Sequence, residues 1–155
     1  WLGKIFVFGG CNNEFEAMKN CEVYDPETRE WTSIEPLDKE TMGASSVVVN
    51  GQILVLGGQN SHAPTAVSNA VRTYDPRNNS WSTGTEMLHS RSDFGCVALP
   101  HSVFAFAGDQ GNNYLMSAER FDFGDSKWTQ LGECGTPRSG FGFFYYKGSI
   151  YALGG

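Results

Sequence analysis

The sequence predicts an all-β protein built from a four-stranded antiparallel unit that repeats along the chain. The first observation is a short apolar stretch, usually ending in two glycines, which opens the chain at residues 3–10 and returns at 51–58, 101–108 and 148–155. The second is composition, because 19 glycines and a 14% aromatic share with hardly any helical periodicity are typical of strands joined by many turns. Self-similarity at a period of about 20–50 residues indicates a repeat architecture.

Fixed spacing between landmark residues defines the repeat. In all three copies an aromatic residue precedes a tryptophan by 7 residues, a Thr/Arg position follows that tryptophan by 10, and the last glycine follows by a further 17. Only the step from this glycine to the next aromatic residue varies, at 14, 16 and 13 residues. Length changes are therefore confined to one loop per repeat. The landmarks are Tyr24, Trp31 and Thr41, then Tyr74, Trp81 and Arg91, and then Phe121, Trp128 and Arg138.

Each repeat is expected to hold four strands, which we name A to D. Asn50-Gly51 favours a tight hairpin turn between A and B, and Asp75-Pro76 a polar turn between C and D. Strand B is the apolar stretch, and strand D surrounds each tryptophan. The expected ranges are 44–49, 94–99 and 141–146 for strand A, and 22–24, 71–74 and 118–121 for strand C.

A four-stranded antiparallel unit of 47–50 residues fits one blade of a β-propeller. We expect one partial propeller over residues 1–155, with repeats at approximately 1–40, 41–90 and 91–137 and an incomplete one at 138–155. The tryptophans and the aromatic residues of strand C should pack between blades, because a single sheet cannot bury both of its faces.

The diglycine, the Tyr-Asp-Pro sequence and the spaced tryptophan resemble the kelch repeat over essentially the whole chain. The third copy departs from the pattern with Ala107-Gly108 in place of Gly-Gly and Phe123 in place of proline. The resemblance implies an innermost strand A and a ring that usually has six blades, of which this chain would supply about three.

The repeat style looks most like that of BTB-kelch (kelch-like) proteins. That resemblance implies substrate recognition for a cullin-RING ubiquitin ligase, which would be engaged through domains outside this sequence. One alternative is an actin-binding or scaffolding kelch protein. Another, less favoured, is an enzyme like galactose oxidase, which uses copper, but the tyrosines and histidines here show no such grouping.

Charge and motifs exclude several other classes of function. A net charge of −6 argues against binding to nucleic acid, and no apolar run is long enough to span a membrane. The four cysteines fall at different phases of the repeat, which favours free thiols in a reducing, cytoplasmic setting, with Cys11 and Cys21 the only pair whose spacing suggests a bridge. No metal-ligand pair, P-loop or nucleophile elbow is present, so we expect neither a cofactor nor catalysis.

The variable B–C loops, Cys11–Asn20, Gln59–Ser68 and Asp109–Met116, are the candidate binding surface, because function accumulates in loops held by a fixed scaffold. Phe15 and Tyr114 are possible aromatic anchors for a protein or peptide, although Phe15 could equally fold back onto its own loop. The polar candidates in these loops are Asn12, Asn13, Glu14, Gln59, Asn60, His62, Asp109, Gln110, Asn112 and Asn113.

The D–A loops, Glu35–Glu40, Gly84–Ser90 and Gly132–Pro137, should reach the same rim. Arg91 and Arg138 follow two of these loops. By resemblance to kelch adaptors that clamp acidic peptides, they are candidates for partner binding. The alternative is that each arginine pairs with a neighbouring blade.

The two ends of such a half ring should expose apolar blade faces and unpaired strand edges. Soluble proteins normally avoid such surfaces. We therefore expect self-association, for example two chains placed head to tail.

Overall fold

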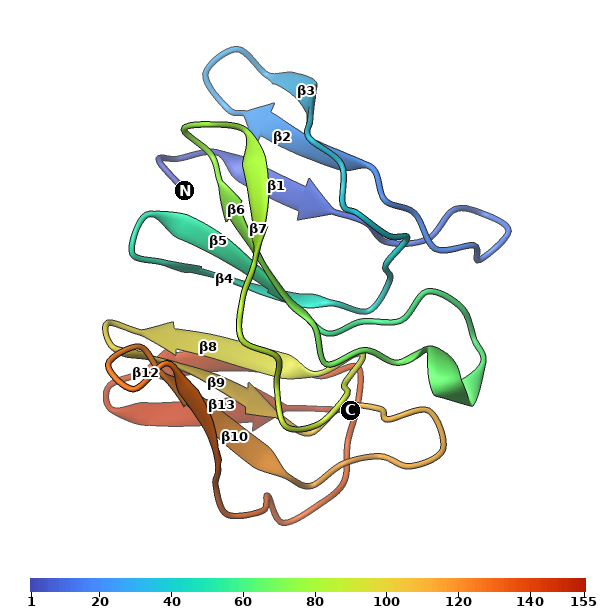
Figure 1. Ribbon diagram of the computed structural model, residues 1–155, viewed down its shortest axis with the longest axis vertical. Helices are drawn as coiled ribbons and strands as arrows, with labels where there is room; N and C mark the ends of the chain where they lie inside the picture. The colour runs from blue at the N-terminus through green and yellow to red at the C-terminus, as the bar shows by residue number, and fades with distance from the viewer.

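The computed structural model describes all residues, 1–155, and contains four antiparallel sheets arranged as a fan (Figure 1). We number the sheets as blades 1 to 4 in chain order. Blade 1 has three strands, blades 2 and 3 have four each, and blade 4 has two. The strands are β1 (Ile5–Phe8), β2 (Cys21–Asp25) and β3 (Glu30–Ile34); β4 (Ser45–Val49), β5 (Gln52–Leu56), β6 (Val71–Asp75) and β7 (Ser80–Thr83); β8 (Gly95–Leu99), β9 (Ser102–Phe106), β10 (Ala118–Asp122) and β11 (Lys127–Gln130); and β12 (Gly142–Tyr146) and β13 (Ser149–Leu153).

The predicted all-β propeller architecture is confirmed. Strands pair in chain order within each blade, and every pairing is antiparallel. The A strands β4, β8 and β12 contact one another across blades, so strand A is innermost, as expected. The only helix is a single 3₁₀ turn at Pro64–Ala66, and no helix is long and apolar enough to cross a membrane.

The hairpin turns follow the predicted chemistry. Asn50 and Gly51 both have positive φ, at 51° and 75°, and Lys147 and Gly148 repeat this at 46° and 85°. Two successive positive φ values define the tight turn whose twist matches that of the flanking strands. The register of these two A–B hairpins is thereby fixed.

The largest apolar core lies between blades 2 and 3. Leu56 and Val103 are fully buried there, and Trp128 from β11 closes the outer end. Burying one aliphatic side chain such as that of Leu56 or Val103 contributes about 1.5–3 kcal/mol to the stability of the fold. Blade 1 packs on blade 2 through Phe8, whose ring centroid lies 5.8 Å from that of the buried Tyr74.

The tryptophans show a repeated contact between blades. The indole N–H of Trp81 donates to the carbonyl of Glu35, and that of Trp128 to the carbonyl of Thr85, each at 2.9 Å. Each acceptor lies in the D–A loop of the preceding blade. The expectation that all three tryptophans pack between blades was wrong for Trp31, which is 53% exposed because no blade lies on the outer face of blade 1.

Both ends of the fan expose apolar side chains, as predicted. Ile5 and Trp31 are more than half exposed on blade 1, and Tyr146 and Leu153 are more than half exposed on blade 4. Whether these faces drive self-association remains a prediction. The cysteines are free, which leaves Cys11 and Cys21 unbridged.

Candidate functional site

The three B–C loops project from the same side of the fan, on the right of Figure 1, while the A–B and C–D turns lie on the left. Two contacts join the loops into one rim. The His62 imidazole lies 3.3 Å from the carbonyl oxygen of Phe15, which links the first loop to the second. Gly111 in the third loop lies so close to Pro64 that a Cβ there would sit 2.1 Å from the proline carbonyl oxygen. The rim is therefore continuous across blades 1 to 3.

Three of the predicted polar residues hold the loops in shape. Asn12 Oδ1 accepts hydrogen bonds from the backbone N–H groups of Glu14 and Glu16, at 3.0 and 2.9 Å. Asp109 accepts from the Gly111 N–H at 2.7 Å, and Gln59 accepts from the Ser92 hydroxyl at 3.2 Å. These side chains have intramolecular partners, so their first role is to order the loops.

The loop tips are the free part of this surface. Phe15 is 68% exposed and Tyr114 is 62% exposed, so neither ring folds back onto the protein. Phe15 also has a positive φ of 61°, which is uncommon for an aromatic residue. The other predicted residues with exposed side chains at the tips are Asn13, Glu14, Asn60, His62, Asn112 and Asn113, whereas Gln110 is half-buried.

Arg91 does not belong to this surface, and its predicted role in partner binding was wrong. Its side chain is fully buried and forms an ion pair with Glu119, with Nε 2.9 Å from Oε1. Its other nitrogens donate to the carbonyls of Ala107 and Ser117 and to the Ser117 hydroxyl. Burial lowers the pKa of Arg91, while the charge of Glu119 opposes that shift. The structure supports the alternative of a structural role, but Arg91 pairs with residues of its own blade 3 and not with a neighbouring blade.

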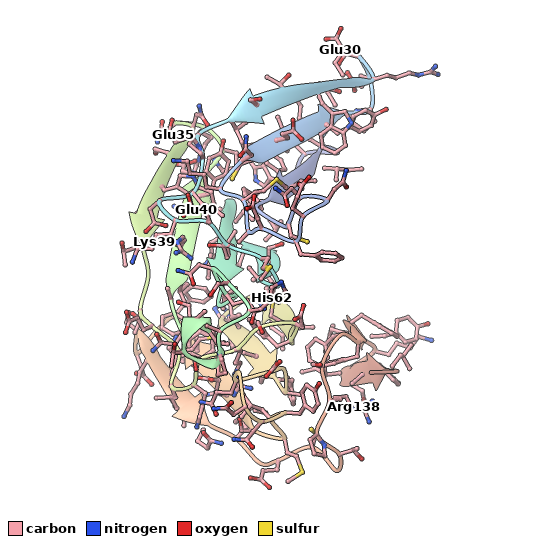
Figure 2. All side chains as sticks on the ribbon, turned by 90° about the vertical axis from the view of Figure 1, so that its right-hand side faces the viewer. Glu30, Glu35, Lys39, Glu40, His62 and Arg138 are labelled. Atoms are coloured by element: carbon pink, nitrogen blue, oxygen red, sulfur yellow. The ribbon has the colours of Figure 1, made fainter.

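Arg138 occupies the same repeat position at the end of the fan. Its Nη1 donates to the carbonyl of Gly154 at 2.7 Å, which repeats the Arg91 bond to Ala107. The side chain remains partly exposed and has no carboxylate partner. Figure 2 shows it beside the strands of blade 4. Whether Arg138 binds a partner remains a prediction.

Acidic groups line the inner part of the rim. Burial raises the pKa of the Asp93 carboxyl, and the nearby charge of Asp109 raises it further. Asp93 also has a positive φ of 49°, and its backbone joins blades 2 to 4 by bonds with Gly43 and Gly140. Asp93 was not among the site residues predicted from the sequence.

The sequence analysis missed a polar cavity between blades 1 and 2. Its volume is about 490 Å³, and the D–A loop residues Asp38 to Thr41 form one wall. Figure 2 shows Lys39 and Glu40 on this loop, next to the strands of blade 2. Arg72 on β6 forms the opposite wall and pairs with Asp38 through its Nε. The signal in the sequence was a departure from the repeat, since threonine replaces arginine at position 41.

Comparison with solved structures supports the fold. The structure of YjhT superposes with a TM-score of 0.75 over 88% of this chain and 51% of that chain, at 18% sequence identity. At that identity the likeness concerns the fold alone.

Sequence comparison supports a family. The chain is 26% identical to Kelch-like protein 40 of Mus musculus over 99% of its length, and 28% identical to Kelch-like protein 25 of Xenopus tropicalis over 90%. It is 30% identical over 96% of its length to an F-box/kelch-repeat protein of Arabidopsis thaliana. It spans 25%, 23% and 38% of these relatives. The model of the KLHDC2/KLHL20/DRC7 Kelch-repeats domain matches residues 2–155, and the chain therefore belongs to the kelch-repeat family.

Proposed function

We propose that this chain is the partner-recognition part of a ubiquitin ligase adaptor and that it binds a protein or peptide on the rim of its B–C and D–A loops. The observation that supports binding at this rim is the pair of exposed aromatic side chains, Phe15 and Tyr114, on loops that also vary in length. Exposed aromatic residues dominate the energetics of protein interfaces. The kelch-like relatives support a kelch-repeat interaction domain rather than an enzyme.

The adaptor role rests on family resemblance. One relative is named as a kelch repeat and BTB domain-containing protein and another as an F-box/kelch-repeat protein. We infer that domains of this kind connect the propeller to a cullin-RING ligase in the cytoplasm. Actin binding or scaffolding remains the alternative, and nothing in the rim favours it.

The binding test is affinity capture with the 155-residue chain as bait. Tyr114→Ala and Phe15→Ala should each weaken capture of the same partner by about tenfold or more, since interface anchors typically cost over 1.4 kcal/mol on truncation. Asn78→Ala is the matched control, because Asn78 lies in the C–D turn at the opposite end of the blade (Figure 1). If Asn78→Ala abolished capture and both loop variants kept it, the binding site would lie on the opposite face and the assignment to the rim would be wrong.

The adaptor test uses the chain as a competitor in cells. If a captured partner is a ligase substrate, the overexpressed chain should occupy it and lower its ubiquitylation. The Tyr114→Ala variant should not do so. Unchanged ubiquitylation of a partner that the chain demonstrably saturates would refute the adaptor role and leave binding intact.

A further inference from the structure

Blade 3 shows how the kelch framework fills the space between a D–A loop and the next blade. The guanidinium of Arg91 occupies it and donates to the carbonyls of Ala107 and Ser117. The carboxylate of Glu119 lies beside it and accepts hydrogen bonds from the backbone N–H groups of Leu88 and His89, at 2.6 and 3.3 Å. One cation and one anion, in direct contact, thus satisfy all of these backbone groups.

Blade 2 has the same backbone without the same side chains. In blade 2, Val71 pairs with Leu56 and the next residue, Arg72, pairs with Val55. In blade 3, the equivalent Ala118 pairs with Phe106 and the next residue, Glu119, pairs with Ala105. Arg72 therefore occupies the position that Glu119 has in blade 3. The fixed repeat spacing likewise puts Thr41 where blade 3 has Arg91. Blade 2 therefore lacks both the buried arginine and its carboxylate.

The cavity between blades 1 and 2 is the space that this exchange leaves. The six counterparts of the blade 3 group all line it, namely Asp38, Lys39, Thr41, Gly57, Ala70 and Arg72. Its volume of about 490 Å³ exceeds what one arginine side chain would fill. The cavity thus lies at the position that the Arg91–Glu119 ion pair fills in blade 3, and it extends into a polar groove.

Backbone groups in this cavity lack the partners that they have in blade 3. The N–H groups of Asp38 and Lys39, counterparts of those that hold Glu119, donate to no protein acceptor. The carbonyl of Gly57, counterpart of the Arg91 acceptor in Ala107, accepts from no protein donor. Asp38 and Lys39 are exposed, so their N–H groups are open to a ligand, whereas Gly57 is buried and its carbonyl needs a partner, because buried polar groups are nearly always hydrogen-bonded.

Arg72 adds a further donor. Its Nε is engaged by Asp38, but its Nη1 is buried and has no hydrogen-bond partner. An acceptor in the cavity would satisfy the two free N–H groups, and a turn of the Arg72 guanidinium toward the cavity would bring Nη1 to the same acceptor. A carboxylate, which can accept several such bonds, suits these donors.

The ligand must also carry a cation. Three acidic residues, Asp38, Glu40 and Glu86, line the cavity against two basic ones, so a ligand with only negative charge would meet net repulsion. The carbonyls of Gly57 and Ala70 stand where blade 3 holds a guanidinium, and Gly57 lacks a donor. These acceptors suit an ammonium or guanidinium group.

We propose that the cavity between blades 1 and 2 binds a small zwitterion, a molecule with an ammonium group beside a carboxylate, such as a free α-amino acid. The carboxylate accepts from Arg72 Nη1 and the N–H groups of Asp38 and Lys39. The ammonium donates to the carbonyls of Gly57 and Ala70. The ligand would restore within one molecule the cation and anion that blade 3 supplies from two side chains. The cavity shares the D–A loop Glu35–Glu40 and the B–C loop Gln59–Ser68 with the proposed protein-binding rim, but the zwitterion would contact neither Phe15 nor Tyr114, so the two proposals are tested separately.

The test is ligand-observed NMR on the 155-residue chain with L-alanine as the probe. Propionate, which lacks the ammonium, and alaninamide, which lacks the carboxylate, should each bind about tenfold more weakly or worse, since each loses a set of charge-assisted hydrogen bonds. No binding of L-alanine at millimolar concentration, or equal binding of all three compounds, would overturn the proposal.

Variants locate the site. Thr41→Arg combined with Arg72→Glu rebuilds the blade 3 pair in blade 2 and should abolish L-alanine binding while the chain stays folded. Arg72→Met, which removes the unpartnered Nη1, should weaken binding about tenfold and serves if the double variant fails to fold. Arg77→Ala is the control, because Arg77 is exposed in the C–D turn of the same blade, and it should bind as the parent does. Unchanged binding in the folded double variant, or in Arg72→Met, would place the ligand elsewhere and refute the assignment.

Discussion

The buried pair of Arg91 and Glu119 should be the most sensitive polar contact in the molecule. Both side chains are fully buried. Replacing Glu119 by alanine removes the acceptor for the N–H groups of Leu88 and His89 and for Arg91 Nε. It also leaves a guanidinium buried without a counter-charge. We expect the free energy of unfolding to fall by about 3–5 kcal/mol, the usual cost of breaking a buried pair from one side.

Glu22 provides a matched control. It stands at the same register position in blade 1, opposite Val7, but its side chain is exposed and makes no ion pair. Glu22→Ala should change stability by no more than about 0.5 kcal/mol, as surface substitutions usually do. The two variants therefore remove the same side chain from the same repeat position and differ in burial and partner.

The assay is urea unfolding followed by tryptophan fluorescence, with thermal melting as a second measurement. A loss of about 3–5 kcal/mol corresponds to a melting temperature lower by about 6–20 °C in a chain of this length. Replacing both Arg91 and Glu119 by apolar residues should recover part of the loss, since no unpaired charge remains. If the Glu119→Ala and Glu22→Ala variants have the same melting temperature, the buried pair contributes nothing to stability and the assignment of Arg91 as structural fails.

Three further predictions follow from packing and exposure. Trp81→Ala should lower the free energy of unfolding in urea by about 3–5 kcal/mol, whereas Trp31→Ala should lower it by under about 1 kcal/mol. Equal losses would mean that Trp81 is not held between blades. Burial raises the pKa of the Cys96 thiol to about 12, so at pH 8 iodoacetamide should modify exposed Cys11 long before Cys96, and equal rates would contradict this burial. Light scattering at micromolar concentration should show self-association through the apolar end faces, and a stable monomer near 17.0 kDa would refute it.

The repeat spacing was sufficient to predict the fold. Spacings fixed at 7, 10 and 17 residues require the same strand pairing in each copy, and the observed strands begin and end within one or two residues of the expected ranges. Turn residues such as Asn50-Gly51 then set the register. Both signals are local in sequence, which is why they can be read without knowing how the blades pack.

Contacts between blades were harder to predict, because they depend on what lies across the interface. Trp31 and Trp81 occupy the same repeat position, yet one is exposed and the other donates to Glu35 of the preceding blade. For Arg91 the sequence likewise left partner binding and structural pairing open, and the ion pair with Glu119 decides between them. Sequence alone shows a charged residue near a rim, but only the paired strand shows whether its charge is already neutralised.

Differences among the repeats therefore carry more functional information than the shared pattern does. Where two copies make the same contact, as in the Trp-to-loop hydrogen bonds of Trp81 and Trp128, the residue serves the framework. In blade 2, Thr41 and Arg72 replace both members of the blade 3 pair, and the framework keeps its shape while a cavity opens. Replacing only one member of such a pair would leave a buried charge without its partner and lower the free energy of unfolding by about 3–5 kcal/mol. With both members replaced, Arg72 pairs instead with Asp38 at the surface. That the two changes occur together, with the backbone groups around them left without partners, is the physical reason to treat this cavity as a site.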